Sequence, residues 1–285
     1  MMAVQKVLVA TDFSEQSRIA IRRAVQICCE HGAQLNLLHV VGDLPIPESL
    51  SPDQHLEKAK RQLENEVVSA PQGIDCRCQI ETGKIFSTIL RSARQTMADL
   101  IVVGAHGHHS LRDNILGTTA EKLVRTRAFP ILVVKQPFES AYRRVLVPTD
   151  FSDASRQALS ATAVLAPGAG IDLLHVYGIW GEEQLNMVGA GEKAEQYRQR
   201  TELWAMASMD KWRLGIDLAG HSVEQHVRKG YASSAIAQFA ADRKNDLVAM
   251  GTVRRSGVSN VLLGNTTENA LRTVPCDILI VPQNV

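Results

Sequence analysis

The eight residues Val-Leu-Val-Ala-Thr-Asp-Phe-Ser at 7–14 decide the fold, because they return at 145–152 as Val-Leu-Val-Pro-Thr-Asp-Phe-Ser. Seven of the eight positions are identical, and Leu-Leu-His-Val at 37–40 also returns unchanged at 173–176. The offset of 136 to 147 residues is much longer than the roughly 20–50 residues of a solenoid repeat. The chain of 285 residues is therefore predicted to be a duplicated domain, divided into 1–138 and 139–285.

Both copies alternate short apolar segments with helical patterns. The strands predicted in the first copy are 6–10, 35–40, 76–81, 100–103 and 131–134. Those predicted in the second copy are 145–147, 172–177, 222–228, 247–250 and 278–281. This alternation indicates an α/β fold, in which each copy has a doubly wound parallel sheet with helices on both faces. The seam at 136–142 is short, so we expect the two domains to pack together.

Composition excludes several classes of function. Lysine and arginine number 31 against 30 acidic residues, so there is no basic excess for binding nucleic acid. No apolar run approaches the roughly 18 residues that span a bilayer, and the first residues do not form a leader. These features predict a soluble, cytoplasmic protein. The five cysteines are unevenly spaced, which argues against a disulfide framework and predicts buried or half-buried thiols.

The candidate site lies where three predicted strands of the first copy end. Thr11 and Asp12 follow the first strand, Val40 ends the second, and Gly104 ends the fourth. In a doubly wound sheet, ligands bind beyond the carboxyl ends of the strands. Asp12 has a second interpretation, since an aspartate at a strand end also stabilises a turn by local hydrogen bonds, and the two roles are compatible.

A glycine-punctuated loop supplies the chemistry. It reads Gly104-Ala105-His106-Gly107, then nine residues, then Gly117-Thr118-Thr119. Residues without a Cβ let an anion lie against backbone amides, and the amides at the start of the next helix favour phosphate. Thr118 is predicted to cap that helix in a capping box with Glu121. A threonine hydroxyl there can donate to a phosphate oxygen or reach its bound metal. The alternative is that the glycines and Thr118 serve only the turn and the cap.

The second copy differs at the residue that matters most for phosphate. Arg254 stands where the first copy has Gly107, and Asn265 stands where it has Thr118. Asparagine remains a good helix cap, so the structural role is retained while the phosphate role is weakened. Alternatively, Arg254 and Arg255 hold a different anion. The sequence thus predicts a degenerate second domain.

These motifs resemble those of the universal stress protein family. The resemblance rests on Gly-x-x-Gly-x9-Gly-Thr after a fourth strand and on Val-Leu-Val-x-Thr-Asp-Phe-Ser, and it covers nearly the whole chain twice. It implies a tandem member with strand order 3-2-1-4-5, a pseudo-dimer made by fifth-strand pairing and, in one branch, ATP binding. Asp12 and Val40 would then lie at the adenosine end, and Gly104, Gly107, Gly117, Thr118 and Thr119 along the ribose and phosphates. The first copy departs from the family at Ala10, where proline is common.

Three functions remain open from the sequence. The first is a stress-response regulator that holds ATP, with or without Mg²⁺, in its first domain. The second is a slow ATP hydrolase using the same pocket, although no residue pair stands out as a general base. The third is a protein-interaction module or a binder of an apolar or anionic ligand. The apolar ligand is considered because Trp204 and Trp212 lie in the longer second insertion with Met206 and Met209. Homodimerisation is also left open.

Overall fold

The computed structural model describes residues 4–42, 52–68, 73–107, 116–137, 140–178, 191–218, 220–253 and 263–283. It is an α/β structure in which ten strands form one sheet. The strands are β1 Lys6–Thr11, β2 Gln34–Val41, β3 Cys76–Thr82, β4 Leu100–Gly104, β5 Ile131–Val134, β6 Arg144–Pro148, β7 Gly170–Tyr177, β8 Val223–Lys229, β9 Leu247–Thr252 and β10 Asp277–Pro282. Every strand predicted from the sequence is present within about two residues of its expected ends.

The strand order is β3-β2-β1-β4-β5-β10-β9-β6-β7-β8. Each half therefore has the order 3-2-1-4-5, with all its internal pairs parallel. The two halves meet where β5 runs antiparallel to β10, with Leu132 opposite Leu279. The two expected five-stranded parallel sheets are thus present, and they are joined edge to edge through their fifth strands, as the family resemblance implied. Hydrogen bonding continues across the seam because β5 and β10 would otherwise leave unpaired edges.

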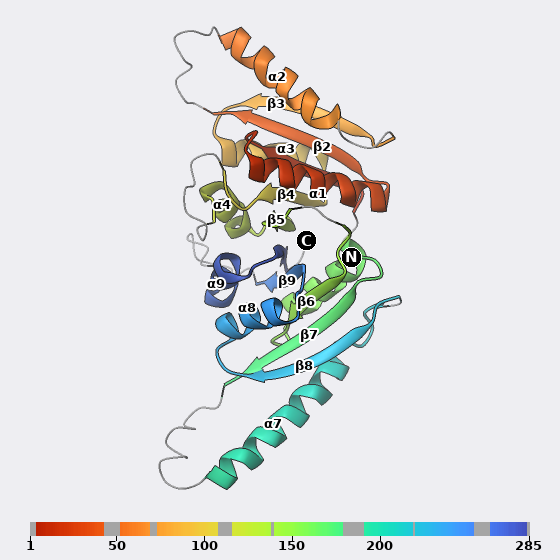
Figure 1. Cartoon of the computed structure of the whole chain (residues 1–285), viewed down its shortest axis with the longest axis vertical. Helices are drawn as coiled ribbons and strands as arrows, with labels where there is room; N and C mark the ends of the chain where they lie inside the picture. The colour runs from red at the N-terminus through yellow and green to blue at the C-terminus, as the bar shows by residue number, and fades with distance from the viewer. Residues whose placement is uncertain are drawn as a thin grey trace.

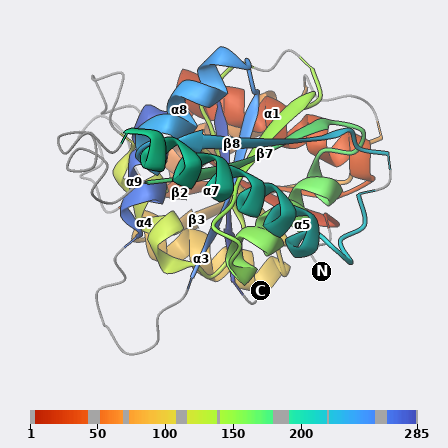
Figure 2. The same cartoon turned by 90° about the horizontal axis from the view of Figure 1, so that it is seen from below.

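Helices cover both faces of this sheet (Figures 1 and 2). One face carries α1 Glu15–His31, α2 Pro52–Val68, α5 Asp153–Leu165 and α7 Gly191–Trp212, which share one apolar core with the strands. The other face carries α3 Ile85–Thr96, α4 Thr118–Thr126, α8 Ala232–Asp242 and α9 Asn265–Thr273, which share a second core. Both faces of the strands are thus apolar, as the continuous apolar runs of the sequence predicted.

The seam between the halves contains a buried ion pair. Arg23 of α1 places its Nε 3.3 Å from Oδ2 of Asp277 in β10, and Asp277 is fully buried. The hydroxyl of Tyr142 donates to the same carboxylate at 2.7 Å. The backbone N–H groups of Lys135 and Gln136 donate to its other oxygen. The predicted domain boundary, between residues 138 and 139, lies outside the described residues and stays a prediction.

No helix among the described residues is both long enough and apolar enough to cross a bilayer. The predicted burial of the thiols is only partly confirmed. Cys28 and Cys276 are buried and Cys76 is half-buried, but Cys29 and Cys78 are exposed. Burial raises the pKa of Cys28, Cys76 and Cys276 to about 12, so these thiols stay neutral over the physiological range.

Candidate functional site

The turn after β1 is built from its own polar side chains. The backbone N–H of Ser14 donates to Asp12 Oδ1 at 3.0 Å, and that of Phe13 donates to Thr11 Oγ1 at 3.0 Å. Phe13 has a φ of 63°, a value uncommon for residues other than glycine. Ser14 caps α1 by accepting from the N–H of Ser17. The turn role foreseen for Asp12 is thus confirmed, while its ligand role stays a prediction.

The second half repeats this turn in detail. Phe151 has a φ of 65°, and Asp150 Oδ1 accepts from the backbone of Ser152 and from the hydroxyl of Ser155. Burial by itself would raise the pKa of Asp150. The hydrogen bonds from Ser152 and Ser155 outweigh that effect and hold the pKa below its ordinary value. Asp150 is therefore ionised at neutral pH.

The three glycines of the first-half loop each lie close to a different neighbour, which a Cβ would approach. A Cβ on Gly104 would lie 3.0 Å from the backbone of Gln16 in α1, so this glycine lets the helix approach β4. A Cβ on Gly107 would lie 2.6 Å from Asp12 Oδ2. A Cβ on Gly117 would lie 3.2 Å from the carbonyl oxygen of Ala105 and 3.8 Å from the backbone nitrogen of Gly107. The loop that follows β4 and the start of α4 are thus held close together, and Gly107 lies beside Asp12.

The predicted capping box at α4 is wrong. The N-cap is Gly117, with φ −60° and ψ 143°, and no side chain caps the helix. Thr118 is already the first helical residue, so its hydroxyl is not placed to accept from the helix N–H groups. In the second half the N-cap is likewise Gly264 and not Asn265. Because glycine offers no side-chain acceptor, the first amides of both helices are left for another acceptor.

His106 completes the first-half loop. It is half-buried, and its Nδ1 is buried without a hydrogen-bond partner among the described residues. Thr11 and Val40 line the same end of the sheet but are buried themselves, whereas Thr118 is exposed and Thr119 is half-buried. The structure therefore places the predicted residues at one end of the parallel strands, although no ligand contact tests them.

A cavity of about 620 Å³ lies at the corresponding place in the second half. Such a volume suits a small molecule, since ligand pockets measure roughly 300–1,000 Å³. Its walls come from the ends of β6, β7 and β9 and from α8 and α9, and one residue comes from the first half, Arg127. The prediction of a degenerate second domain did not foresee this cavity. Arg254, on which that prediction rests, lies outside the described residues.

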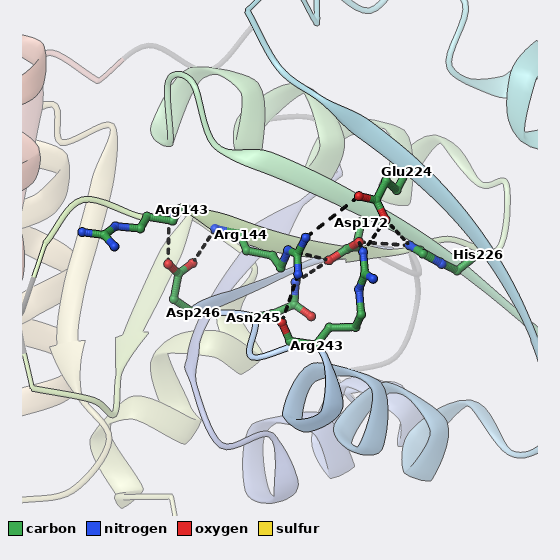
Figure 3. Close-up of polar contacts among 8 residues, drawn as sticks. All are labelled: Arg143, Arg144, Asp172, Glu224, His226, Arg243, Asn245 and Asp246. Atoms are coloured by element: carbon green, nitrogen blue, oxygen red, sulfur yellow. Dashed lines mark hydrogen bonds and ion pairs between the residues drawn. The ribbon is translucent and has the colours of Figure 1, made fainter.

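A polar cluster that the sequence did not reveal lies near the amino ends of β6, β7 and β8 (Figure 3). Asp172, Glu224 and His226 bring potential metal-ligand atoms within 4.8 Å of one another. Arg243 already pairs with both carboxylates, at 3.0 Å from Asp172 Oδ1, and Arg144 Nε lies 3.6 Å from Asp172 Oδ2. The guanidinium groups match the acidic charge, so the cluster is an ion-pair network and we assign it no metal.

Asp172 is the centre of that network. Burial alone would raise its pKa, but hydrogen bonds from Asn245, Arg243 and His226 outweigh that effect and lower it. The repeat gives the signal that could have found this cluster, because the residue matching Asp172 in the first half is Asn36. A new charge at a buried strand position needs new partners.

The tryptophans and methionines of α7 do not form one buried stripe. Met209 and Trp212 are buried against the sheet, whereas Trp204 is 59% exposed and Met206 is 38% exposed. The ring of Trp204 packs edge-on against Phe151, with centroids 5.7 Å apart. The core interpretation holds for half of the set, and the apolar-ligand alternative stays a prediction.

Comparison with known proteins gives the family. A family model described as "Universal stress protein family" matches residues 3–135 and 141–282. The chain is 25% identical over 305 residues to the universal stress protein E homolog of Haemophilus influenzae, covering 98% of this chain and 97% of that protein. It is 28% identical over 141 residues to universal stress protein A homolog 1 of Coxiella burnetii, covering 47% of this chain and 97% of that protein.

A solved structure shows the same fold. The crystal structure of a universal stress protein from Archaeoglobus fulgidus superposes with a TM-score of 0.67 at 18% identity, covering 98% of each chain. At this identity the likeness concerns the fold alone.

Proposed function

Because the chain belongs to the universal stress protein family, we propose that it is a nucleotide-binding regulatory protein that holds ATP in its first half. The observation that carries the proposal is His106 Nδ1, a buried polar atom without a hydrogen-bond partner among the described residues. It lies in the loop that the sequence pattern assigns to phosphate. A buried polar group without a partner costs free energy, and a bound ligand that accepts or donates at this atom would remove that cost.

The surrounding geometry suits a nucleotide. The start of α4 lacks a side-chain cap, so its amides and helix dipole favour a phosphate group. Gly117 leaves no Cβ between this helix start and the loop, and Gly107 leaves none against Asp12. Thr118 and Thr119 would then offer hydroxyls to a phosphate oxygen or its Mg²⁺, and Asp12 and Val40 would contact the adenosine.

The test is calorimetric titration with ATP, with and without Mg²⁺. We expect one nucleotide per chain. Gly107→Val should abolish binding, because its Cβ would lie 2.6 Å from Asp12 Oδ2. The matched control is Gly178→Val, since a Cβ on this exposed glycine meets no atom within 4 Å. Two sites per chain, or one site that Gly107→Val leaves intact, would contradict the proposal.

The hydrolase alternative is separated by measuring turnover with and without Mg²⁺ in the wild type and in Gly117→Val. Hydrolysis that continues unchanged in the variant would exclude this pocket as a catalytic site. A cytoplasmic location and self-association stay predictions from the sequence, to be checked by cell fractionation and light scattering.

A further inference from the structure

One charged residue of the first half crosses the seam and lines the cavity of the second half. Arg127 is the C-cap of α4 and is only 7% exposed. Its side chain lines the second-half cavity, and its Nη1 donates to the carbonyl oxygen of Val253 there. A guanidinium keeps its positive charge whatever hydrogen bonds it makes. The wall of this cavity therefore carries a fixed, buried cation.

The repeat makes this cation asymmetric. The residue matching Arg127 in the second copy is Val274, the C-cap of α9, which is buried and uncharged. The two halves pair through β5 and β10, so this pairing brings Arg127 to the second-half cavity and offers only a valine at the matching place. The buried positive charge of Arg127 therefore serves the second-half cavity and has no counterpart at Val274.

A second observation points to a ligand. Thr252 ends β9, lines the cavity and is only 5% exposed. Its hydroxyl oxygen has no hydrogen-bond partner among the described residues. The matching residue of the first half is Ala105, so the hydroxyl is also specific to the second half. Buried polar groups without a partner are rare in folded proteins, and a ligand oxygen would satisfy this one.

The rest of the lining defines the ligand. The start of α9, with Gly264 as an N-cap that offers no side-chain acceptor, presents backbone amides to the cavity. Apolar side chains from the sheet and α8 make up another part of the wall, namely Leu174, Val176, Ile236, Met250 and Leu263. Asp150 also lines the cavity, but its carboxylate is held by Ser152 and Ser155 at the start of α5. The negative group of a ligand is therefore expected beside Arg127 and α9, away from Asp150.

We propose that the second-half cavity binds a small molecule that carries a phosphate monoester on an apolar body, with Arg127, Thr252 and the start of α9 holding the phosphate. This site is separate from the proposed ATP site and does not depend on it. The chain then receives two different ligands, one in each half.

The test uses 1-naphthyl phosphate as the probe and 1-naphthol as its neutral counterpart, titrated by calorimetry. We expect the wild type to bind 1-naphthyl phosphate. Arg127→Met should lower this affinity by about 10-fold or more, which is the effect of losing one charge-assisted hydrogen bond. The affinity for 1-naphthol should not change. Arg125→Met is the matched control, because Arg125 lies on the same helix but pairs with Glu121 and Glu268.

Thr252→Val is the second variant, and it changes the shape of the side chain very little. It should weaken the binding of 1-naphthyl phosphate. The thermal unfolding midpoint should stay equal or rise, because the variant removes a buried hydroxyl without a partner among the described residues. Gly107→Val should leave naphthyl phosphate binding unchanged. Three results would each overturn the proposal. The wild type does not bind 1-naphthyl phosphate, Arg127→Met lowers the affinities for 1-naphthyl phosphate and 1-naphthol equally, or Gly107→Val abolishes the binding of 1-naphthyl phosphate.

Discussion

Arg23 and Asp277 are 254 positions apart in the chain, yet Arg23 Nε lies 3.3 Å from Asp277 Oδ2 in the buried seam between the two halves. The Arg23 guanidinium also stacks 4.1 Å from the centroid of the Tyr142 ring. A pair buried this deeply depends on both partners, because removing one leaves the other charge uncompensated.

Asp277→Asn should therefore lower the free energy of unfolding by about 3–5 kcal/mol, as expected when one partner of a buried ion pair is removed. Urea denaturation measures this change. Arg23→Met combined with Asp277→Asn should recover part of the loss, since no unmatched charge remains. Glu57→Gln, which removes an exposed pair with Arg61, should change the stability little. Equal effects of Asp277→Asn and Glu57→Gln would contradict a structural role for the seam pair.

Two matching glycines differ in how closely a helix approaches them. A Cβ on Gly251 would lie 2.0 Å from the carbonyl oxygen of Ala154, whereas a Cβ on Gly104 would lie 3.0 Å from Gln16. Gly104→Ala should cost about 1–3 kcal/mol as overpacking, and Gly251→Ala should cost more, because helix α5 must move. Thermal denaturation with Gly178→Ala as the control measures both. The reverse order would show that the approach of α5 is not what requires glycine.

The helix starts give a prediction about capping. Ser14 and Ser152 cap α1 and α5 through their side chains, so each serine-to-alanine change should cost about 1 kcal/mol. Thr118→Ala should leave stability nearly unchanged, because Gly117 is the N-cap of α4. The three variants are compared by denaturant midpoints. A loss in Thr118→Ala as large as that in Ser14→Ala would restore the capping box.

Buried thiols predict a loss of stability at high pH. Burial first, then nearby Asp277, raises the pKa of Cys276 from 9.0 to about 12 in the folded protein. The unfolded chain releases this proton earlier, so the contribution of Cys276 is complete below pH 9 and is lost as the pH rises towards 12. Between pH 8.5 and 10.5, Cys276→Ala should therefore lose less stability than the wild type. Cys29→Ala, at an exposed thiol, should follow the wild type.

The strands and helices were predicted well from the sequence, because apolar runs such as residues 100–103 and 131–134 are buried on both faces only when helices cover both sides of the sheet. The pairing of the two fifth strands was implied only by the family resemblance, since nothing in the residues of β5 identifies its antiparallel partner. The capping error at Thr118 arose because Gly117 and Thr118 are both acceptable caps by residue type, and only backbone geometry separates them.

The second-half cavity was missed for another reason. Its distinguishing cation, Arg127, belongs to the first copy and lies far along the chain from the second-copy loop that starts at Gly251, and the residue that matches it is the uncharged Val274. Comparing the loops of the two copies drew attention to Arg254 instead. A comparison of every pair of repeat positions would have marked Arg127 and Asp172, but not the partners that they meet in space.

The antiparallel junction of β5 and β10 also bears on how such a protein can diverge after gene duplication. In a dimer of identical chains, every mutation appears twice, so a helpful change at one site brings the same change to the other. Joining the two copies in one gene removes that constraint. Arg127 can then be selected for its effect on one cavity while Val274 stays apolar, and a once symmetric pair becomes free to specialise.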